Sequence, residues 1–202
     1  MMGDTQLNAA EIKIGVVGLG LMGCSITTCL LMAGHPVVAV APVSVDLTFA
    51  LKRITKHLQR SRREKLVTQA PDFYLQHLHI TESYDQLQGC ALVIECTLEN
   101  LDIKKSVYRK IEAVIDKNAL LASNTSAIPI SILQQQTTHP SRFFGLHWAE
   151  PSHTTRFLEV ICGNESDIAK GEYLYELSHL WGKEPTLVRK DIRGFITNRI
   201  MY

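Results

Sequence analysis

The chain has almost no net charge and no long run of apolar residues. Lysine plus arginine total 21 and aspartate plus glutamate total 20 in 202 residues, so the formal net charge is +1. This balance gives no reason to expect nucleic acid or an acidic membrane surface as a partner. No apolar run approaches the ~20 residues that span a bilayer. The polar start, Met1–Ala10, also lacks the basic-then-apolar layout of a signal peptide.

The sequence also lacks paired cysteines. Its five cysteines are spread through apparent core segments, and no two of them form a CxxC pair. We therefore expect neither a metal site nor a disulfide framework, and we expect a reducing, cytoplasmic setting. Cys24 lies near the start of a predicted helix, where a thiol pKa can be lowered, but burial as a small apolar side chain is the interpretation that we favour.

What the chain does have is a glycine-rich turn between an apolar run and a helix. Residues Ile12–Val17 are typical of a strand, and a helix is expected over Cys24–Ala33. Between them, Gly18 permits a tight turn, Gly20 lets the backbone approach a pyrophosphate, and Gly23 allows close packing of helix on sheet. A helix N-terminus also favours the phosphate charge. The predicted cofactor contacts in this dinucleotide-binding turn are Gly18, Leu19, Gly20, Leu21, Met22 and Gly23.

Apolar runs and helical segments alternate along the rest of the chain. A second strand at Val37–Ala41 closes a β-α-β unit of about 30 residues, and the intervening helix makes the two strands parallel. Helices are expected at Val45–Val67, Leu101–Ile115, Ile130–Gln136 and Ser166–Trp181. Apolar runs follow at His77–Thr81, Ala91–Cys96, Ala119–Ala122, Phe143–Trp148, Arg156–Ile161 and Thr186–Val188. The alternation predicts a Rossmann-like, doubly wound, mostly parallel α/β sheet.

The sequence also predicts the exposed face and the end of the helix expected at Val45–Val67. Its basic residues, such as Arg60, Arg62 and Arg63, are interpreted as the solvated outer face of a helix. Pro71 is expected to end any continuation of that helix.

Four polar residues stand at the ends of apolar runs, and they are Ser126, His147, Glu159 and Asn198. The ligand crevice of an open α/β sheet lies beyond the carboxyl ends of its strands, where we expect Ser126. Each residue also has an ordinary structural explanation. A serine after a strand is typical of a turn or a cap, a histidine among aromatics is typical of a hydrogen-bonded core, and a glutamate is often only solvated.

Six stretches of the chain resemble the L-3-hydroxyacyl-CoA dehydrogenase family. They are Gly18–Gly23, Glu99–Lys104, Ser123–Ser126, Arg142–His147, Phe157–Val160 and Gly194–Arg199. They occur in the family's order and at its spacing, from about Lys13 to the last residue. The resemblance is to the N-terminal NAD-binding domain of the family.

The resemblance implies roles for the polar residues. His147 would remove the proton of the 3-hydroxyl group of an acyl-CoA substrate while hydride passes to NAD, and Glu159 would hold the imidazole in the right tautomer. Ser126 and Asn198 would hold the substrate oxygen. Glu99, Lys104 and Asn124 match cofactor-contacting positions. The spacing of the first two also suits an ordinary surface pair on a helix.

The chain departs from the family at the end of the second strand. The family has an acid there that accepts hydrogen bonds from the adenosine ribose, whereas this chain has Ala41 followed by Pro42, and Asp46 lies too far along to be an automatic replacement. A charge-assisted hydrogen bond contributes ~1.5–3 kcal/mol, so we expect NAD binding to be weaker by roughly one or two powers of ten. No arginine follows Ala41 to meet a 2′-phosphate, so NADP is neither favoured nor excluded.

Two further departures from the family concern the residues that follow His147 and the length of the chain. Glu150 stands where the family's His-Phe-Phe-Asn-Pro motif has asparagine. It would place a carboxylate near the reacting carbon for a more polar substrate, raise the pKa of His147, or face solvent.

Family members also continue into a helical domain that completes the acyl-CoA crevice and makes the homodimer. We expect the dinucleotide-binding domain over residues 1–192 and the beginning of a truncated or absent helical domain over residues 193–202, with nucleotide binding surviving better than turnover.

The sequence thus predicts an NAD-dependent 3-hydroxyacyl-CoA dehydrogenase. Two alternatives stay open. One is a member of the same family that acts on a hydroxy sugar acid, which Glu150 suggests, and the other is a non-catalytic nucleotide-binding or regulatory relative, which Ala41 suggests.

Overall fold

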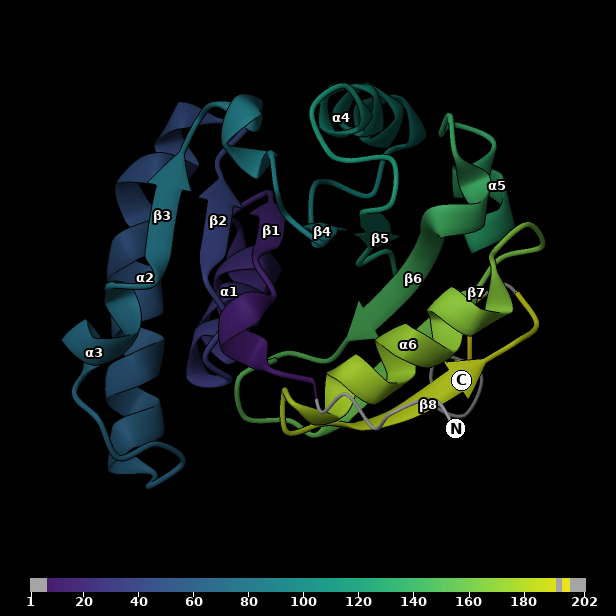
Figure 1. Cartoon of the computed structure of the whole chain (residues 1–202). Helices are drawn as coiled ribbons and strands as arrows, with labels where there is room; N and C mark the ends of the chain where they lie inside the picture. Colours follow the sequence, from purple (N-terminus) through teal and green to yellow (C-terminus); the bar gives the residue numbers. More distant parts are fainter. Residues whose placement is uncertain (1–6, 192–193, 197–202) are drawn as a thin grey trace.

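The computed structural model describes residues 7–191 and 194–196 and places eight strands in one sheet, in the order β3-β2-β1-β4-β5-β6-β7-β8 (Figure 1). The strands are β1 (Ile14–Val17), β2 (Val37–Val40), β3 (Leu78–Thr81), β4 (Leu92–Glu95), β5 (Leu120–Ser123), β6 (Phe143–Trp148), β7 (Phe157–Cys162) and β8 (Glu184–Val188). The described α-helices are α1 (Leu21–Met32), α2 (Ser44–Arg63), α3 (Pro71–Leu75), α4 (Leu101–Glu112), α5 (Ile130–Gln134) and α6 (Ile168–His179).

The sheet is parallel from β3 to β6. Strand β7 runs antiparallel to β6, and β8 is parallel to β7. From β1 the chain builds outward through β2 and β3 on one side and then returns to start β4 on the other, so strand order reverses between β1 and β4. The predicted doubly wound, mostly parallel sheet is confirmed, and its switch point lies where the glycine turn leaves β1.

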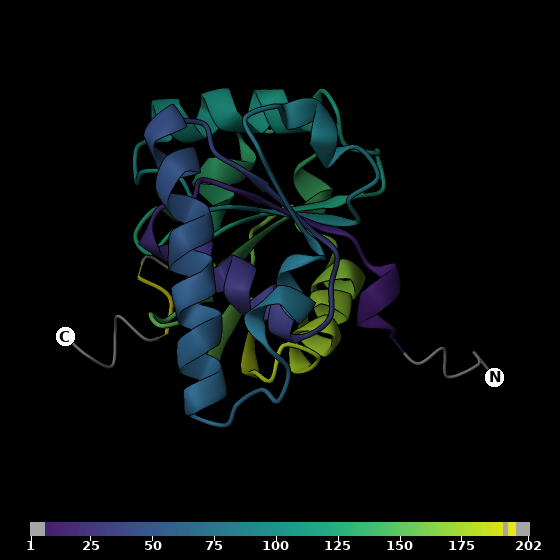
Figure 2. The same cartoon turned by 90° about the vertical axis from the view of Figure 1, so that its left-hand side faces the viewer.

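Helices cover both faces of the sheet (Figures 1 and 2). In β1, Ile14 and Val16 join the core cluster beneath α1, α2 and α6, whereas Val17 joins the cluster beneath α4 and α5. Alternate residues of a strand point to opposite faces, so a strand covered on both sides favours apolar residues at every position. The unbroken apolar run of the first strand follows from this double cover. In the described part of the chain, no helix is both long and apolar enough to cross a membrane.

The end of α2 differs from the expectation. The helix ends at Arg63, and Lys65 has a φ of 60°. Pro71 does not end that helix but begins α3, at the first helical position. Proline has no N–H to lose there, and its fixed φ suits a helix start.

The glycine turn fixes how α1 meets the sheet. Gly18 has a φ of 97°, a conformation that side-chain-bearing residues rarely adopt. A Cβ built on Gly23 would lie 1.8 Å from the Gly18 carbonyl oxygen, whereas one built on Gly20 would have nothing within 4 Å. The structure therefore gives Gly23 a packing role and leaves open space at Gly20.

The two glycines predict a contrast between substitutions. Gly23→Ala must push α1 off the turn, because the contact is with backbone, and we expect the free energy of unfolding to fall by ~1–3 kcal/mol. Gly20→Ala, at the start of α1, should change it by less than about 1 kcal/mol. Urea titrations followed by circular dichroism measure both. Equal stability of the two variants would contradict the described packing.

Candidate functional site

His147 and Glu159 are brought together by strand register. They are Cα partners in the antiparallel pair formed by β6 and β7, so their side chains lie side by side on one face of the sheet. The His147 Nδ1 and Glu159 Oε2 atoms are 2.7 Å apart, and the two residues are 7% and 1% exposed. Because β6 runs parallel to β5, β4 and β1, its carboxyl end lies at the same edge of the sheet as the glycine turn.

Aromatic rings enclose the imidazole. The His147 ring meets Phe157 edge-on at 5.9 Å between centroids and Phe195 in a tilted contact at 5.4 Å. The Ile196 N–H also donates to Glu159 Oε1 at 2.8 Å. Sequence reasoning missed this contribution of Phe195 and Ile196, although both lie in the Gly194–Arg199 stretch that carries the resemblance. Within that stretch, the sequence assigned a role only to Asn198.

The contacts of Glu159 determine what His147 can do. A carboxylate accepts hydrogen bonds, so it selects the neutral tautomer whose Nδ1 carries the proton. That tautomer leaves Nε2 as the ring atom able to take a proton. Glu159 also stabilises the imidazolium that forms afterwards. The pair is therefore suited to act as a general base with a fixed orienting anion.

A separate apolar cleft of about 410 Å³ opens at the glycine turn, beyond the carboxyl ends of β1, β2 and β4. It is lined by Gly18, Gly20, Leu21, Met22, Pro42, Val43, Asp46, Cys96, Thr97, Leu98, Ile103 and Val107. At its rim, Leu21, Val43 and Leu98 expose 68%, 56% and 72% of their surface. Apolar side chains left this open in a cleft indicate a site for a flat, largely apolar ligand group.

The predicted residues of the glycine turn separate into two groups. Gly18, Gly20, Leu21 and Met22 line the cleft. Leu19 is fully buried in the core, and Gly23 packs against the turn, so these two residues support the cleft from beneath. In the described structure, the N-terminus of α1 carries no side-chain cap. Its first N–H groups are thus available to an anion.

Lys104 is not on the surface, contrary to the alternative of an ordinary surface pair. It is fully buried, and its Nζ lies 2.9 Å from both carboxylate oxygens of Glu95, at the end of β4. The hydroxyl groups of Ser123 and Tyr108 also donate to Glu95, at 2.6 Å and 3.1 Å. Lys104 therefore belongs to a buried network rather than to the lining of the cleft. Nothing in the spacing of the sequence pointed to Glu95.

The same lysine connects to the loop that carries Ser126. Lys104 Nζ lies 3.4 Å from Glu99 Oε2, and Glu99 Oε1 accepts from the N–H groups of Ser126, Ala127 and Ile128 at 3.0 to 3.3 Å. Partial burial raises the pKa of Glu99, but a hydrogen bond from Thr125 and other hydrogen bonds and charges outweigh it and hold that pKa below its ordinary value. Glu99 is thus the anchor of the Ser126 loop.

Of the two predicted asparagines, the structure describes Asn124 but not Asn198. The Asn124 Oδ1 accepts from the Trp148 N–H at 3.1 Å and so ties the end of β5 to the residue after His147. Asn198 lies outside the described residues, and its predicted role stays a prediction. The cofactor roles of Glu99, Lys104 and Asn124 also stay predictions.

The loop after β6 is held against α1. The Ser25 hydroxyl of α1 accepts from the Ser152 N–H at 2.8 Å and lies 3.0 Å from His153 Nδ1. Glu150 is exposed at the surface, and its partial burial raises its pKa, while the nearby Ser25 hydroxyl and Ser152 N–H act in the opposite direction. Beneath the loop, the buried Lys183 donates to the carbonyls of Ser152 and Thr155. The loop that carries Glu150 is therefore fixed against α1 through Ser152 and His153.

The cysteines are free, and burial governs the one at the turn. Burial raises the pKa of Cys24 to about 11, although Arg53 acts in the opposite direction. Cys24 is therefore a buried apolar side chain, the interpretation favoured from the sequence.

Within the described ranges there is no group of three or more His, Cys, Asp or Glu side chains that could hold a metal ion.

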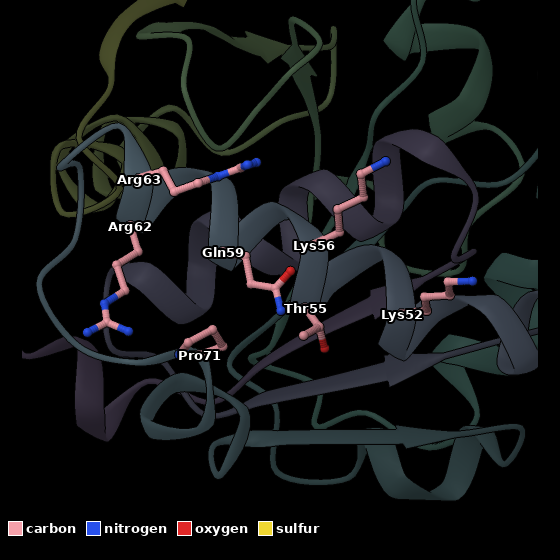
Figure 3. A pocket seen from close by; sticks show the side chains of 7 residues that line it. All are labelled: Lys52, Thr55, Lys56, Gln59, Arg62, Arg63 and Pro71. Atoms are coloured by element: carbon pink, nitrogen blue, oxygen red, sulfur yellow. The ribbon is translucent and has the colours of Figure 1, made fainter.

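The basic residues of α2 line a groove of about 1070 Å³ on another face of that helix (Figure 3). It is lined by Lys52, Thr55, Lys56, Gln59, Arg62, Arg63 and Pro71. By helical periodicity these positions lie on a different side of α2 from Asp46. The predicted solvated basic face is seen here as an open, cationic groove outside the cleft.

Two features meet at one edge of the doubly wound sheet: a glycine turn that opens a helix without a side-chain cap, and a buried histidine–carboxylate pair. Together they define a dinucleotide-binding domain with a candidate general base beside the cofactor cleft. The chain belongs to the family described as "3-hydroxyacyl-CoA dehydrogenase, NAD binding domain", whose model matches residues 13–192. The predicted family and its NAD cofactor are thereby confirmed.

Individual proteins with similar sequences or structures carry names that fit this family. The chain is 35% identical over 191 residues to a 3-hydroxybutyryl-CoA dehydrogenase of Bradyrhizobium diazoefficiens, covering 94% of this chain and 64% of the relative. It is 33% identical over 193 residues to a 5-formyl-3-hydroxy-2-methylpyridine 4-carboxylate 5-dehydrogenase of Mesorhizobium japonicum, covering 94% and 61%. The crystal structure of (S)-3-hydroxybutyryl-CoA dehydrogenase from Ralstonia eutropha superposes with a TM-score of 0.88 at 30% identity, covering 94% and 67%. The chain therefore spans roughly two thirds of the length of these relatives.

The loop after His147 predicts a pH dependence of stability. Burial, the stacked ring of His57 at 4.4 Å and the charge of Arg60 lower the pKa of His153 from 6.5 to about 4. The unfolded chain takes up this proton near pH 6.5 and the folded chain only near pH 4. The stability from neutral His153 is thus fully present above the higher value and lost as the pH falls toward the lower one.

We expect the free energy of unfolding in urea to fall between about pH 7 and about pH 4.5, and to fall less in His153→Gln. His79→Gln, at an exposed position of β3, is the control and should follow the unsubstituted protein. An identical pH dependence in all three proteins would rule out this role of His153.

Proposed function

We propose that this protein is an NAD-dependent 3-hydroxyacyl-CoA dehydrogenase, in which His147 is the general base and Glu159 orients it. The observation that carries the proposal is the 2.7 Å contact between His147 Nδ1 and Glu159 Oε2, at the same edge of the sheet as the glycine turn. The family assignment and the relatives named as 3-hydroxybutyryl-CoA dehydrogenases support it.

The described residues fit NAD. The cleft at the turn is apolar, a Cβ at Gly20 would occupy open space within it, and α1 offers uncapped N–H groups beside it. Gly18, Gly20, Leu21 and Met22 would hold the nucleotide. When bound, NAD supplies the acceptor for the hydride that leaves the substrate carbon.

The protein's own part in the reaction is proton transfer. His147 Nε2 accepts the proton of the 3-hydroxyl group during oxidation and returns it during reduction. Glu159 keeps Nδ1 protonated and balances the charge of the imidazolium. Ser126 and Asn198 are proposed to bind the substrate oxygen, with Glu99 positioning the Ser126 loop through its backbone N–H groups.

The remaining predictions belong to the same proposal. An acyl-CoA thioester is the proposed substrate, and a homodimer is the proposed state of the whole protein. The free cysteines support a reducing, cytoplasmic setting. We also propose that residues 193–202 begin a helical domain, in which case Phe195 and Ile196 would connect it to the His147–Glu159 pair.

The substrate is tested by direct assay. The whole protein is purified and given NADH with acetoacetyl-CoA or with a panel of keto sugar acids, and NADH absorbance is followed. Oxidation of NADH with acetoacetyl-CoA is the expected result. Turnover confined to sugar acids would replace the proposed substrate. Saturable NADH binding without turnover of any substrate would favour the non-catalytic alternative.

The role of the base is tested by substitution. His147→Gln should lower kcat by roughly 100 to 10,000-fold, the usual contribution of general-base assistance, and should leave the Kd for NADH within about twofold. Glu159→Gln should lower kcat in the same direction. His139→Gln, at an exposed position before β6, should have no effect. Full activity of His147→Gln would refute the assignment.

A further inference from the structure

The adenosine end of the cleft lacks the acid that the family places there. Ala41 follows β2 directly and is 1% exposed, so its methyl group belongs to the core and not to the cleft. Pro42 and Val43, which come next, line the cleft but offer no side-chain hydrogen-bond acceptor. The hydroxyl groups of a bound adenosine ribose therefore need a partner from another position.

One charged side chain lines this cleft among the described residues, and it is Asp46. The chain turns sharply after β2, and the Asp46 N–H donates to the Val43 carbonyl at 2.9 Å. Helix α2 starts at Ser44, so Asp46 lies in its first turn, and this side chain lines the cleft together with the glycine turn. The position that appears too distant along the sequence thus reaches the same cleft.

Asp46 stands at the start of a helix, among apolar cleft residues. It lies in the first turn of α2, where the helix dipole favours an acidic side chain. Its neighbours in the cleft are Pro42, Val43, Gly20 and Leu21, which are apolar or without a side chain. A carboxylate in such surroundings makes stronger hydrogen bonds to hydroxyl groups than one in open water.

We propose that Asp46 replaces the missing strand-end acid and accepts hydrogen bonds from the adenosine ribose hydroxyls of NAD. The inference rests on the proposed function, because it assigns a residue of the cofactor site. The same carboxylate repels a 2′-phosphate, so Asp46 also selects NAD over NADP.

Arg53 is the cation that could have favoured NADP. It lies two helical turns beyond Asp46 on the same side of α2. Its Nη1 donates to the Leu19 carbonyl within the glycine turn at 3.4 Å, and its guanidinium lies 5.9 Å from the centre of the Phe49 ring. Arg53 is thus engaged with the underside of the turn and does not line the cleft.

The test compares cofactor binding in variants whose fold is checked by thermal unfolding. The Kd values for NADH and NADPH are measured from the change in nicotinamide fluorescence. In the unsubstituted protein NADH should bind more tightly than NADPH. Asp46→Asn should weaken NADH binding by roughly tenfold or more, the loss of one charge-assisted hydrogen bond. The affinity of Asp46→Asn for NADPH should not fall, so the ratio of the two Kd values should move closer to one.

Two further variants sharpen the result. Asp72→Asn removes an exposed carboxylate from the first turn of α3, outside the cleft, and should leave both Kd values unchanged. Asp46→Glu keeps a carboxylate at the same position of the cleft and should retain more NADH affinity than Asp46→Asn.

Equal NADH affinity of Asp46→Asn and the unsubstituted protein would overturn the inference, and so would an initial preference for NADPH. Failure of the unsubstituted protein to bind NADH at all would instead overturn the proposed function.

Discussion

The site depends on the hydrogen bond between the buried Glu159 carboxylate and His147 Nδ1. A buried carboxylate is costly unless it is hydrogen-bonded, and Glu159 has partners at both oxygens, His147 on one and the Ile196 N–H on the other. Removing the imidazole would leave one of those oxygens without the partner shown here. The pairing of β6 with β7 and the turn at Gly194–Ile196 therefore act together on one carboxylate and, through it, on the orientation of one imidazole ring.

A second buried network holds the other half of the site. Lys104 balances Glu95 at the end of β4 and reaches Glu99, which in turn holds the loop containing Ser126. Removing one partner of such a buried pair typically costs ~3–5 kcal/mol, because the other charge is left unpaired. The ends of β4, β5 and β6 are thus joined by polar contacts, and these strands end at the edge where the glycine turn opens.

Much of this could be predicted from the sequence because it depends on local patterns. Apolar runs such as Ile14–Val17 fix a strand covered on both faces, and the glycine spacing fixes the turn. The contribution of Phe195 and the burial of Lys104 could not be predicted, because they depend on which segments meet in three dimensions. The position of Asp46 shows the same limit. Its distance from Ala41 along the chain suggested that it was out of reach, and the turn at Val43 brings it into the cleft.

The tautomer of His147 tests the central claim most directly. The ring nitrogens are observed by ¹⁵N NMR at neutral pH, and His147 is assigned by the loss of its signals in His147→Gln. The account predicts a proton on Nδ1, held by Glu159, and an unprotonated Nε2. A neutral ring that carries its proton on Nε2 would contradict it, because the nitrogen required to take the substrate proton would already be occupied.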